Sequence, residues 1–194
     1  MSVVGHFSAL ARMARIRAAR FVLRQRILAR HPTLVCDPTA IWDYGYRDIG
    51  AIEIGANVSV GAFAEIVVQA RSAHSSVPGR LILADGAVIG SGANIRAAGG
   101  TIRLGRESGV SPHTVVIAAN HESGGEGARL RTRWNETTTG VDVGENVWVG
   151  SHSVLLPGTR IGNGSVVAAG SVVRGAIPPG ELWGGVPARK LRDL

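Results

Sequence analysis

The sequence predicts a single-domain parallel β-helix, an all-β solenoid whose coils consist of short strands and corners. The first observation is a run of aliphatic residues spaced six apart: Val143, Val149, Leu155, Ile161, Val167 and Val173. A period of six fits neither the 3.6-residue helix nor simple strand alternation, but it fits one strand and one corner per hexad. The second is the 27 glycines, which suit a chain that turns every few residues. The third is an aromatic content of 5%, which requires an aliphatic core.

Each hexad also offers a second inward position, four residues after the aliphatic one. It is usually small: Val147, Ser153, Thr159, Ser165, Ser171 and Ile177. Glycine or another small residue directly follows most of the aliphatic residues, as in Val149-Gly150. We expect that residue to ease the corner backbone.

Residues 1–32 are predicted to form a basic N-terminal segment, with an amphipathic helix over 1–30 that Pro32 closes. Its arginine-free face, at about 100° per residue, is expected to hold apolar side chains: Phe7, Leu10, Ala14, Ala18, Phe21 and Leu28. The segment contains seven arginines and no acidic residue: Arg12, Arg15, Arg17, Arg20, Arg24, Arg26 and Arg30.

This helix has two candidate roles. It caps the open end of the solenoid, which repeat folds require, or it docks on anionic lipid or a lipid-linked substrate. The net charge of +7 belongs to this segment alone, because the other 14 basic residues match the chain's 14 acidic ones. A neutral body without a reading motif argues against nucleic-acid binding.

The β-helix itself is predicted over residues 33–178. Its earlier aliphatic positions fall in three groups: Ile54, Val60, Ile66; Leu83, Ile89, Ile95; and Leu104, Val110, Val116. A protruding loop over 71–80 separates the first two groups, and a slip of three residues near Gly99-Gly100 separates the others. A long excursion loop covers 122–140, and a tail covers 179–194.

Three features bear on the cellular compartment. The single Cys36 excludes an internal disulfide framework and is expected to be a buried small hydrophobe. No apolar run reaches the roughly 18 residues of a membrane span. Arginines interrupt the N-terminus from Arg12, so a secretory signal is not expected there. The sequence therefore predicts a cytoplasmic protein with possible membrane association.

Two segments closely resemble the hexapeptide-repeat acyltransferases: VWVGSHSVLLPGTRIGNGSVVAAGSVV at 147–173 and GGVPARKLR at 184–192. The nearest branch is the galactoside and maltose O-acetyltransferases with related polysaccharide acetyltransferases. The resemblance runs from about Leu104 to the C-terminus, and more loosely from Ile54. It implies a left-handed β-helix, a homotrimer with sites at subunit interfaces, and acetyl-CoA as donor. No metal is expected, because no two histidines lie five apart.

The resemblance also implies a catalytic base. The family's histidine follows a hydrophobic hexad and opens the long excursion, which corresponds to His121 in VVIAANH. A sugar hydroxyl is a poor nucleophile at neutral pH, so a base must take its proton during attack on the thioester. An imidazole suits that task, which is typically worth about 10²–10⁴-fold in rate.

The donor site follows from the same resemblance. Ser151 matches a serine whose backbone N–H faces the thioester oxygen, and Ala169 matches a corner residue that bonds the pantetheine arm. Arg189 and Arg192 match basic residues near the coenzyme's phosphates, and Lys190 between them is a further candidate.

Three residues are candidates for acceptor binding. Trp148 matches the family's VWIG tryptophan beside the cleft, with corner packing as its alternative role. Glu136 is expected to orient His121, bind acceptor or remain an exposed loop carboxylate. Asn94 belongs to a stretch, 94–100, that carries carboxylates in galactoside enzymes but none here. The acceptor is therefore not expected to bind as it does in those enzymes.

The sequence also bears on several alternative functions. Carbonic anhydrases of the γ class need histidines five apart, and the closest pair here, His113 and His121, is eight apart. Serine acetyltransferases carry a larger N-terminal helical domain. An N-acetyltransferase of a nucleotide-linked amino sugar and a non-catalytic hexapeptide scaffold remain open. The sequence favours O-acetyl transfer to a hydroxyl of a sugar or glycan precursor, in surface-polysaccharide or glycolipid synthesis.

Overall fold

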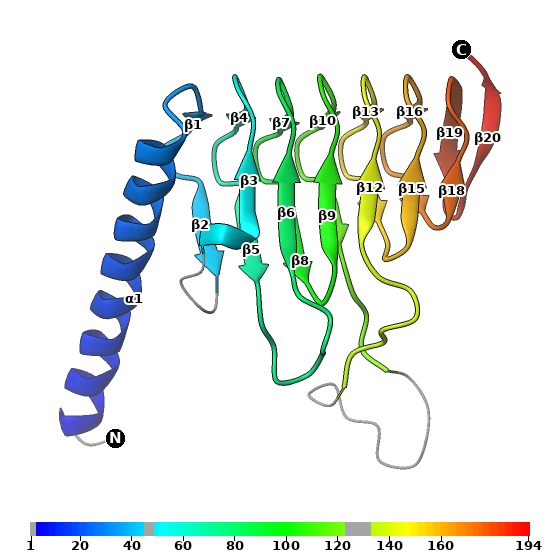
Figure 1. The fold of residues 1–194 in the computed structure, drawn as a ribbon. Coiled ribbons are helices and arrows are strands. Elements are labelled where there is room, and N and C mark those ends of the chain that lie inside the picture. The colour runs from blue at the N-terminus through cyan, green and yellow to red at the C-terminus, as the bar shows by residue number, and fades with distance from the viewer. Residues whose placement is uncertain (1–2, 45–48, 123–132) are drawn as a thin grey trace.

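The protein is a three-sided prism of parallel strands with one long helix at its N-terminal end (Figure 1). The computed structural model describes residues 3–44, 49–122 and 133–194. The chain passes from sheet A to sheet B to sheet C and then returns to sheet A one coil further on. This repeated path forms the predicted parallel β-helix.

Each sheet takes every third strand. Sheet A contains β1 (Val35–Cys36), β4 (Ser59–Val60), β7 (Val88–Ile89), β10 (Gly109–Val110), β13 (Trp148–Val149), β16 (Val166–Val167), β19 (Glu181–Gly185) and β20 (Ala188–Asp193). Sheet B contains β2 (Ile41–Tyr44), β5 (Glu65–Gln69), β8 (Asn94–Ala98), β11 (Val115–Ile117), β14 (Val154–Leu155) and β17 (Val172–Val173). Sheet C contains β3 (Ile52–Ile54), β6 (Arg80–Leu83), β9 (Thr101–Leu104), β12 (Val141–Val143), β15 (Thr159–Ile161) and β18 (Ala176–Ile177). A short 3-10 helix, η1 (Ile49–Ala51), precedes β3.

The core consists of aliphatic side chains stacked from coil to coil. All six residues of the C-terminal hexads are at most 3% exposed, which confirms the six-residue reading of the sequence. Parallel pairing in register, such as Val110 with Val149 and Val149 with Val167, places each on the equivalent residue of the next coil. Burying one such side chain stabilises the fold by roughly 1.5–3 kcal/mol.

At several coils the second inward position holds a small polar residue whose hydroxyl hydrogen-bonds to a backbone carbonyl. Ser108 Oγ donates to the carbonyl of Gly144 at 2.6 Å, and Ser165 Oγ donates to that of Pro178 at 2.7 Å. Ser171 Oγ likewise donates to the carbonyl of Ala168 at 2.6 Å. A buried hydroxyl without a partner would be costly, so these bonds explain why serine is tolerated inside.

The glycines that follow the aliphatic residues were expected to ease the corner backbone, but the structure gives a different reason for them. Positive φ occurs two positions beyond the glycine of a hexad, as at Asn146 (φ 52°) and His152 (φ 59°). Gly150 has no positive φ, but a Cβ there would lie 2.5 Å from the backbone nitrogen of Ala169 in the next coil. Close approach of two coils, rather than backbone conformation, therefore requires that glycine.

Helix α1 (Val3–Arg30) lies beside the first coil (Figure 1). Ala14, Ala18 and Phe21 of the arginine-free face are exposed, whereas Leu23 and Ile27 are buried against the solenoid. Arg20 and Arg24 on this packing side take partners from the first coil, which offsets part of the cost of facing them inward. Their Nε atoms are buried without a partner among the described residues. Within the described ranges, no helix is long and apolar enough to cross a membrane.

Cys36 is half-buried rather than buried as expected, and its Sγ accepts a hydrogen bond of 3.4 Å from Trp42 Nε1. Two loops leave the solenoid where sheet B passes to sheet C, one after β5 and one after β11. The middle of the expected excursion 122–140, residues 123–132, lies outside the described residues.

Candidate active site

His121 lies at the mouth of a pocket of about 240 Å³ on the outer face of sheet B. Strands β5, β8 and β11 and the returning loop line it: Val67, Gln69, Arg96, Ala98, Ile117, Ala119, Asn120, His121 and Trp134. His121 is exposed, and no described residue hydrogen-bonds to its imidazole. Within the described residues, the ring is therefore open to a molecule bound in the pocket.

Trp134 forms the wall of this pocket opposite the sheet. It pairs with His121 in an isolated antiparallel bridge, and the two rings meet edge to face with centroids 6.2 Å apart. The bridge is flanked by hydrogen bonds from the N–H of Glu122 to Arg133 O and from the N–H of Asn135 to Asn120 O, at 3.1 and 2.8 Å. The indole also packs over Gly99, where a Cβ would lie 2.6 Å from it.

Glu136 ties the two loops together instead of contacting His121. Its carboxylate accepts hydrogen bonds from Ser75 Oγ at 2.9 Å, Ser76 N at 2.6 Å and Ser76 Oγ at 2.9 Å. Trp134 N donates to the carbonyl of His74 at 2.9 Å beside this contact. The loops after β5 and β11 thus form one connected wall, and Glu136 is not among the residues that line the pocket.

These hydrogen bonds lower the pKa of Glu136, led by the bond from the backbone N–H of Ser76. A lowered pKa means that the loop contact is fully present above about pH 4.3, the ordinary glutamate value, and is lost as pH falls through the folded pKa. We expect the protection factor of the Ser76 amide, the ratio of its intrinsic to its observed exchange rate, to fall as the solution is acidified from pH 6 to below pH 4. Glu136→Gln should remove most of that pH dependence; equal acid sensitivity in both proteins would contradict the contact.

Arg96 is held in place by two neighbours on sheet B. Its Nη2 lies 3.0 Å from Glu65 Oε2, and its Nε donates to Asn94 Oδ1 at 2.7 Å. Asn94 Nδ2 donates in turn to Glu65 Oε2 at 3.0 Å. Asn94, expected to contact acceptor, therefore lies beside the pocket and positions Arg96, which lines it.

Ser151 and Ala169 occupy neighbouring coils at the corner between sheets A and B. The N–H of Gly170 donates to the carbonyl of Ser151 at 2.8 Å, which joins the two corners. No described residue accepts a hydrogen bond from the backbone N–H of Ser151. That N–H is therefore available to an oxygen atom outside the solenoid.

The last two strands extend this corner toward the C-terminus. The N–H of Ala168 donates to Trp183 O on β19, which pairs antiparallel with β20. Arg189 and Arg192 donate only to backbone carbonyls in the described part of the chain, at 2.9 and 3.0 Å. The arginine charges therefore face solvent without an acidic partner.

Lys190 differs from the two arginines. Its Nζ lies 2.7 Å from both Asp193 Oδ1 and Glu181 Oε1, and these hydrogen bonds raise its pKa. The bonds from Lys190 and Trp183 lower the pKa of Glu181. This lysine is neutralised inside the hairpin, so it is a weaker phosphate ligand than its neighbours.

A single chain does not bring the two halves of the predicted site together. Ser151 lies where the chain enters sheet B, whereas His121 lies beyond the opposite edge, where the chain leaves it. From Thr114 at the entry corner to His121 the extended chain covers roughly 20 Å. Trp148, which is 61% exposed and donates to Ser111 Oγ at 2.8 Å, lies on the Ser151 side.

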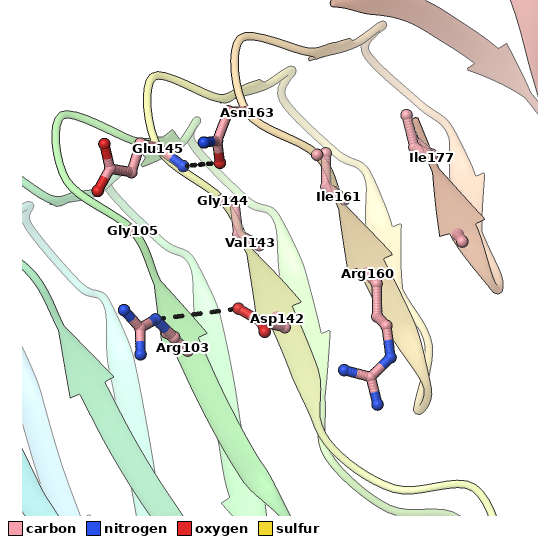
Figure 2. Close-up of a pocket in the computed structure, with 12 residues that line it drawn as sticks. Arg103, Gly105, Asp142, Val143, Gly144, Glu145, Arg160, Ile161, Asn163 and Ile177 are labelled. Carbon is pink, nitrogen blue, oxygen red and sulfur yellow. Dashed lines mark hydrogen bonds and ion pairs between the residues drawn. The ribbon is translucent and has the colours of Figure 1, made fainter. Parts of the chain in front are cut away.

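A second groove of about 430 Å³ lies on the outer face of sheet C (Figure 2). Register places Arg103, Asp142 and Arg160 side by side, with Arg103 Nε 4.0 Å from Asp142 Oδ1. Asn163 Oδ1 accepts a hydrogen bond of 2.9 Å from the N–H of Glu145 at the corner. None of the predicted site residues is among its described lining residues, and we assign it no role in the reaction.

The sequence did not point to Arg96 or Trp134 as pocket residues. Trp134 lies in a loop without a repeat pattern. The one feature that could have marked it as a pocket residue was its large aromatic side chain within the excursion. For metals, the described residues hold no group of three or more His, Cys, Asp or Glu side chains placed to bind an ion.

Comparison with known proteins identifies the repeat. Residues 140–175 match the bacterial transferase hexapeptide family, described as six repeats. The chain carries the bacterial transferase hexapeptide repeat. The matched segment contains the buried hexads Val143 to Val173, and the resemblance predicted from them is confirmed.

Two relatives from Escherichia coli K12 are enzymes by name. Galactoside O-acetyltransferase is 35% identical over 94 residues, which are 48% of this chain and 45% of that protein. WbbJ, a proposed lipopolysaccharide biosynthesis O-acetyl transferase, is 29% identical over 184 residues, which are 91% of this chain and 87% of that protein. The chain thus matches about half the length of the galactoside enzyme and most of WbbJ.

Solved structures of two acyltransferases share the fold. The N-acyltransferase AntD of Bacillus cereus, bound to dTDP and coenzyme A in a mutant form, has a TM-score of 0.67 at 22% identity, covering 82% of this chain and 80% of that one. The acetyltransferase domain of PglB from Neisseria gonorrhoeae, with acetyl coenzyme A, has a TM-score of 0.54 at 19% identity, covering 82% and 58%. The predicted left-handed parallel β-helix is confirmed.

Proposed function

We propose that the protein transfers acetyl from acetyl-CoA to a hydroxyl of a sugar or glycan precursor. The observation that carries the proposal is the exposed imidazole of His121 at the mouth of a pocket at the root of the excursion loop. The hexapeptide repeat and two relatives named as O-acetyltransferases support this activity.

His121 acts as general base in this proposal. Its imidazole takes the proton of the acceptor hydroxyl while the oxygen attacks the thioester carbonyl. Collapse of the tetrahedral intermediate breaks the carbon–sulfur bond and releases the thiolate of coenzyme A. The imidazolium then returns the proton to that sulfur, so atoms and charge balance without a covalent acyl-enzyme.

Ser151 stabilises the oxyanion of the intermediate through its unengaged backbone N–H. One such donor is worth roughly 3–4 kcal/mol in comparable sites. Ala169 in the next coil bonds the pantetheine arm, and the unpaired arginines of β20 face the coenzyme's phosphates. Trp148 borders the donor cleft on the same side.

We propose that the site is completed in a homotrimer. His121 and Ser151 lie on opposite edges of sheet B in one chain, so one chain cannot present both to the same thioester. A neighbouring copy placed alongside brings its own corner to the His121 pocket. Because an AntD mutant binds dTDP-4-amino-4,6-dideoxyglucose and WbbJ is named for lipopolysaccharide biosynthesis, we place the acceptor among surface-polysaccharide or glycolipid precursors.

The decisive experiment measures free thiol released from acetyl-CoA over a panel of acceptors. We expect release with sugars that offer only hydroxyls. Release only with a nucleotide-linked amino sugar would replace this proposal with N-acetyl transfer, and no release with any acceptor would favour a non-catalytic scaffold.

Replacing Arg189 and Arg192 together with alanine should raise the KM for acetyl-CoA by roughly tenfold or more and leave the acceptor KM nearly unchanged. Each charge-assisted phosphate contact is worth about 1.5–3 kcal/mol, and tenfold corresponds to about 1.4 kcal/mol. Lys190→Ala is the matched control, because the ammonium group of Lys190 is already paired with Asp193 and Glu181. A larger effect from Lys190→Ala, or a rise in acceptor KM alone, would contradict the assignment.

We also propose that the protein works in the cytoplasm and touches a membrane through its basic helix. Glycolipid precursors reside at such a surface, so peripheral contact would raise their local concentration near the site.

A further inference from the structure

Helix α1 carries an apolar face that the solenoid leaves uncovered. Phe21 is 63% exposed and Val22 is 54% exposed, although both belong to a helix that is attached to the core. Leu23 and Ile27, on the opposite side, make that attachment. The uncovered face spans an arc of about 100°, contains no arginine and includes one polar residue, Gln25, among apolar ones: Ala11, Ala14, Ala18, Phe21, Val22 and Ala29. Ala18 and Val22 lie beside a groove that Trp42 and Asp43 of the first coil also line.

The arginines of α1 divide into two sets. Arg20 lies 2.6 Å from Asp43 Oδ2, and Arg24 donates to the carbonyl of Cys36 at 3.0 Å, so these two fasten the helix to the first coil. Arg15, Arg17 and Arg26 are exposed along the borders of the uncovered face. Residues 1–30 contain no acidic side chain that would neutralise them.

We infer that this face lies on an anionic membrane surface, with the helix axis parallel to the surface. Phe21 and Val22 enter the boundary between headgroups and acyl chains, while Arg15, Arg17 and Arg26 meet lipid phosphates. An apolar face bordered by cations on a helix too polar to span a bilayer is the pattern of an interfacial helix.

Charge selects the membrane over the same face of a second copy as the occupant. Two such faces in contact would bring their bordering arginines together, and α1 offers no carboxylate to pair with them. The inference specifies the membrane contact proposed above. It concerns binding alone, so its failure and the failure of acetyl transfer would be separate results.

The test is sedimentation of the full-length protein with vesicles of phosphatidylcholine containing about 30% phosphatidylglycerol, against phosphatidylcholine alone. We expect binding to the anionic vesicles only. Phe21→Ser with Val22→Ser should weaken it at least about tenfold, since two apolar side chains lose their burial. Val35→Ser is the control, because Val35 is an apolar side chain 67% exposed on β1. Circular dichroism would verify that α1 remains folded.

Charge is tested with Arg15, Arg17 and Arg26 changed to glutamine. We expect roughly fivefold weaker binding per arginine, and little change when the same number of charges is removed from the solenoid: Arg71→Gln, Arg160→Gln and Arg174→Gln. Equal sedimentation with both vesicle types would overturn the inference, as would full binding by the Phe21/Val22 variant. Light scattering could also contradict the inference. The contradicting result is a wild-type protein that assembles in solution and does not bind vesicles, together with a Phe21/Val22 variant that no longer assembles. A second copy of the chain would then cover the face.

Discussion

His121→Ala is expected to lower kcat for acetyl transfer by about 10²–10⁴-fold while leaving the affinity for acetyl-CoA nearly unchanged. The imidazole is exposed beside the pocket, and no residue in the described part of the chain hydrogen-bonds to its nitrogen atoms. Its removal therefore costs proton transfer and little packing. The measurement is thiol release under saturating donor and acceptor, with isothermal titration of coenzyme A alongside.

Two further variants separate chemistry from shape at this position. Trp134→Phe keeps an aromatic wall against Gly99 and should retain much of the activity. His31→Asn, at the end of α1 and away from the pocket, controls for the loss of an imidazole as such. Turnover by His121→Ala close to that of the wild type would sink the base assignment, whatever Trp134 does.

The solenoid was predictable from sequence because its stabilising contacts repeat with the chain. Leu155 stacks between Val116 and Val173 through parallel pairing in register, so each coil imposes the same spacing on the next. A ladder of this kind leaves one buried aliphatic residue per hexad. The period was therefore visible without any knowledge of long-range contacts.

The contacts that shape the pocket follow no period. Glu136 meets Ser75 and Ser76, 61 and 60 residues earlier in the chain, and Trp134 closes on Gly99. Such pairings depend on how two loops leave adjacent coils, and local sequence does not specify that. His121 itself was predicted only because a family resemblance marked the position, and its catalytic role stays a prediction.

The packing side of α1 could not be predicted for a related reason. Helical periodicity identified an arginine-free stripe correctly, but it could not say which stripe meets the solenoid. Asp43 and the carbonyl of Cys36 on the first coil accept hydrogen bonds from Arg20 and Arg24, so a side of the helix that bears arginine packs inward. Partners on another element decided the orientation.

Gly150→Ala is expected to damage both the fold and the donor site. The added Cβ would lie 2.5 Å from the nitrogen of Ala169 and 2.9 Å from its Cα and from the carbonyl oxygen of Val167. All three atoms are backbone, so the neighbouring coil must shift rather than a side chain. Overpacking of this kind costs about 1–3 kcal/mol of unfolding free energy.

The same shift should separate Ser151 from Ala169, which the hydrogen bond from Gly170 to Ser151 now holds together. We therefore expect a raised KM for acetyl-CoA in addition to a lower unfolding midpoint. Gly164→Ala is the matched control, because its Cβ would meet nothing within 4 Å and its cost comes only from a φ of +68°. That control should lose roughly 1–2 kcal/mol of stability with an unchanged KM. If both variants had the same KM for acetyl-CoA, close coil spacing at Gly150 would not shape the donor site.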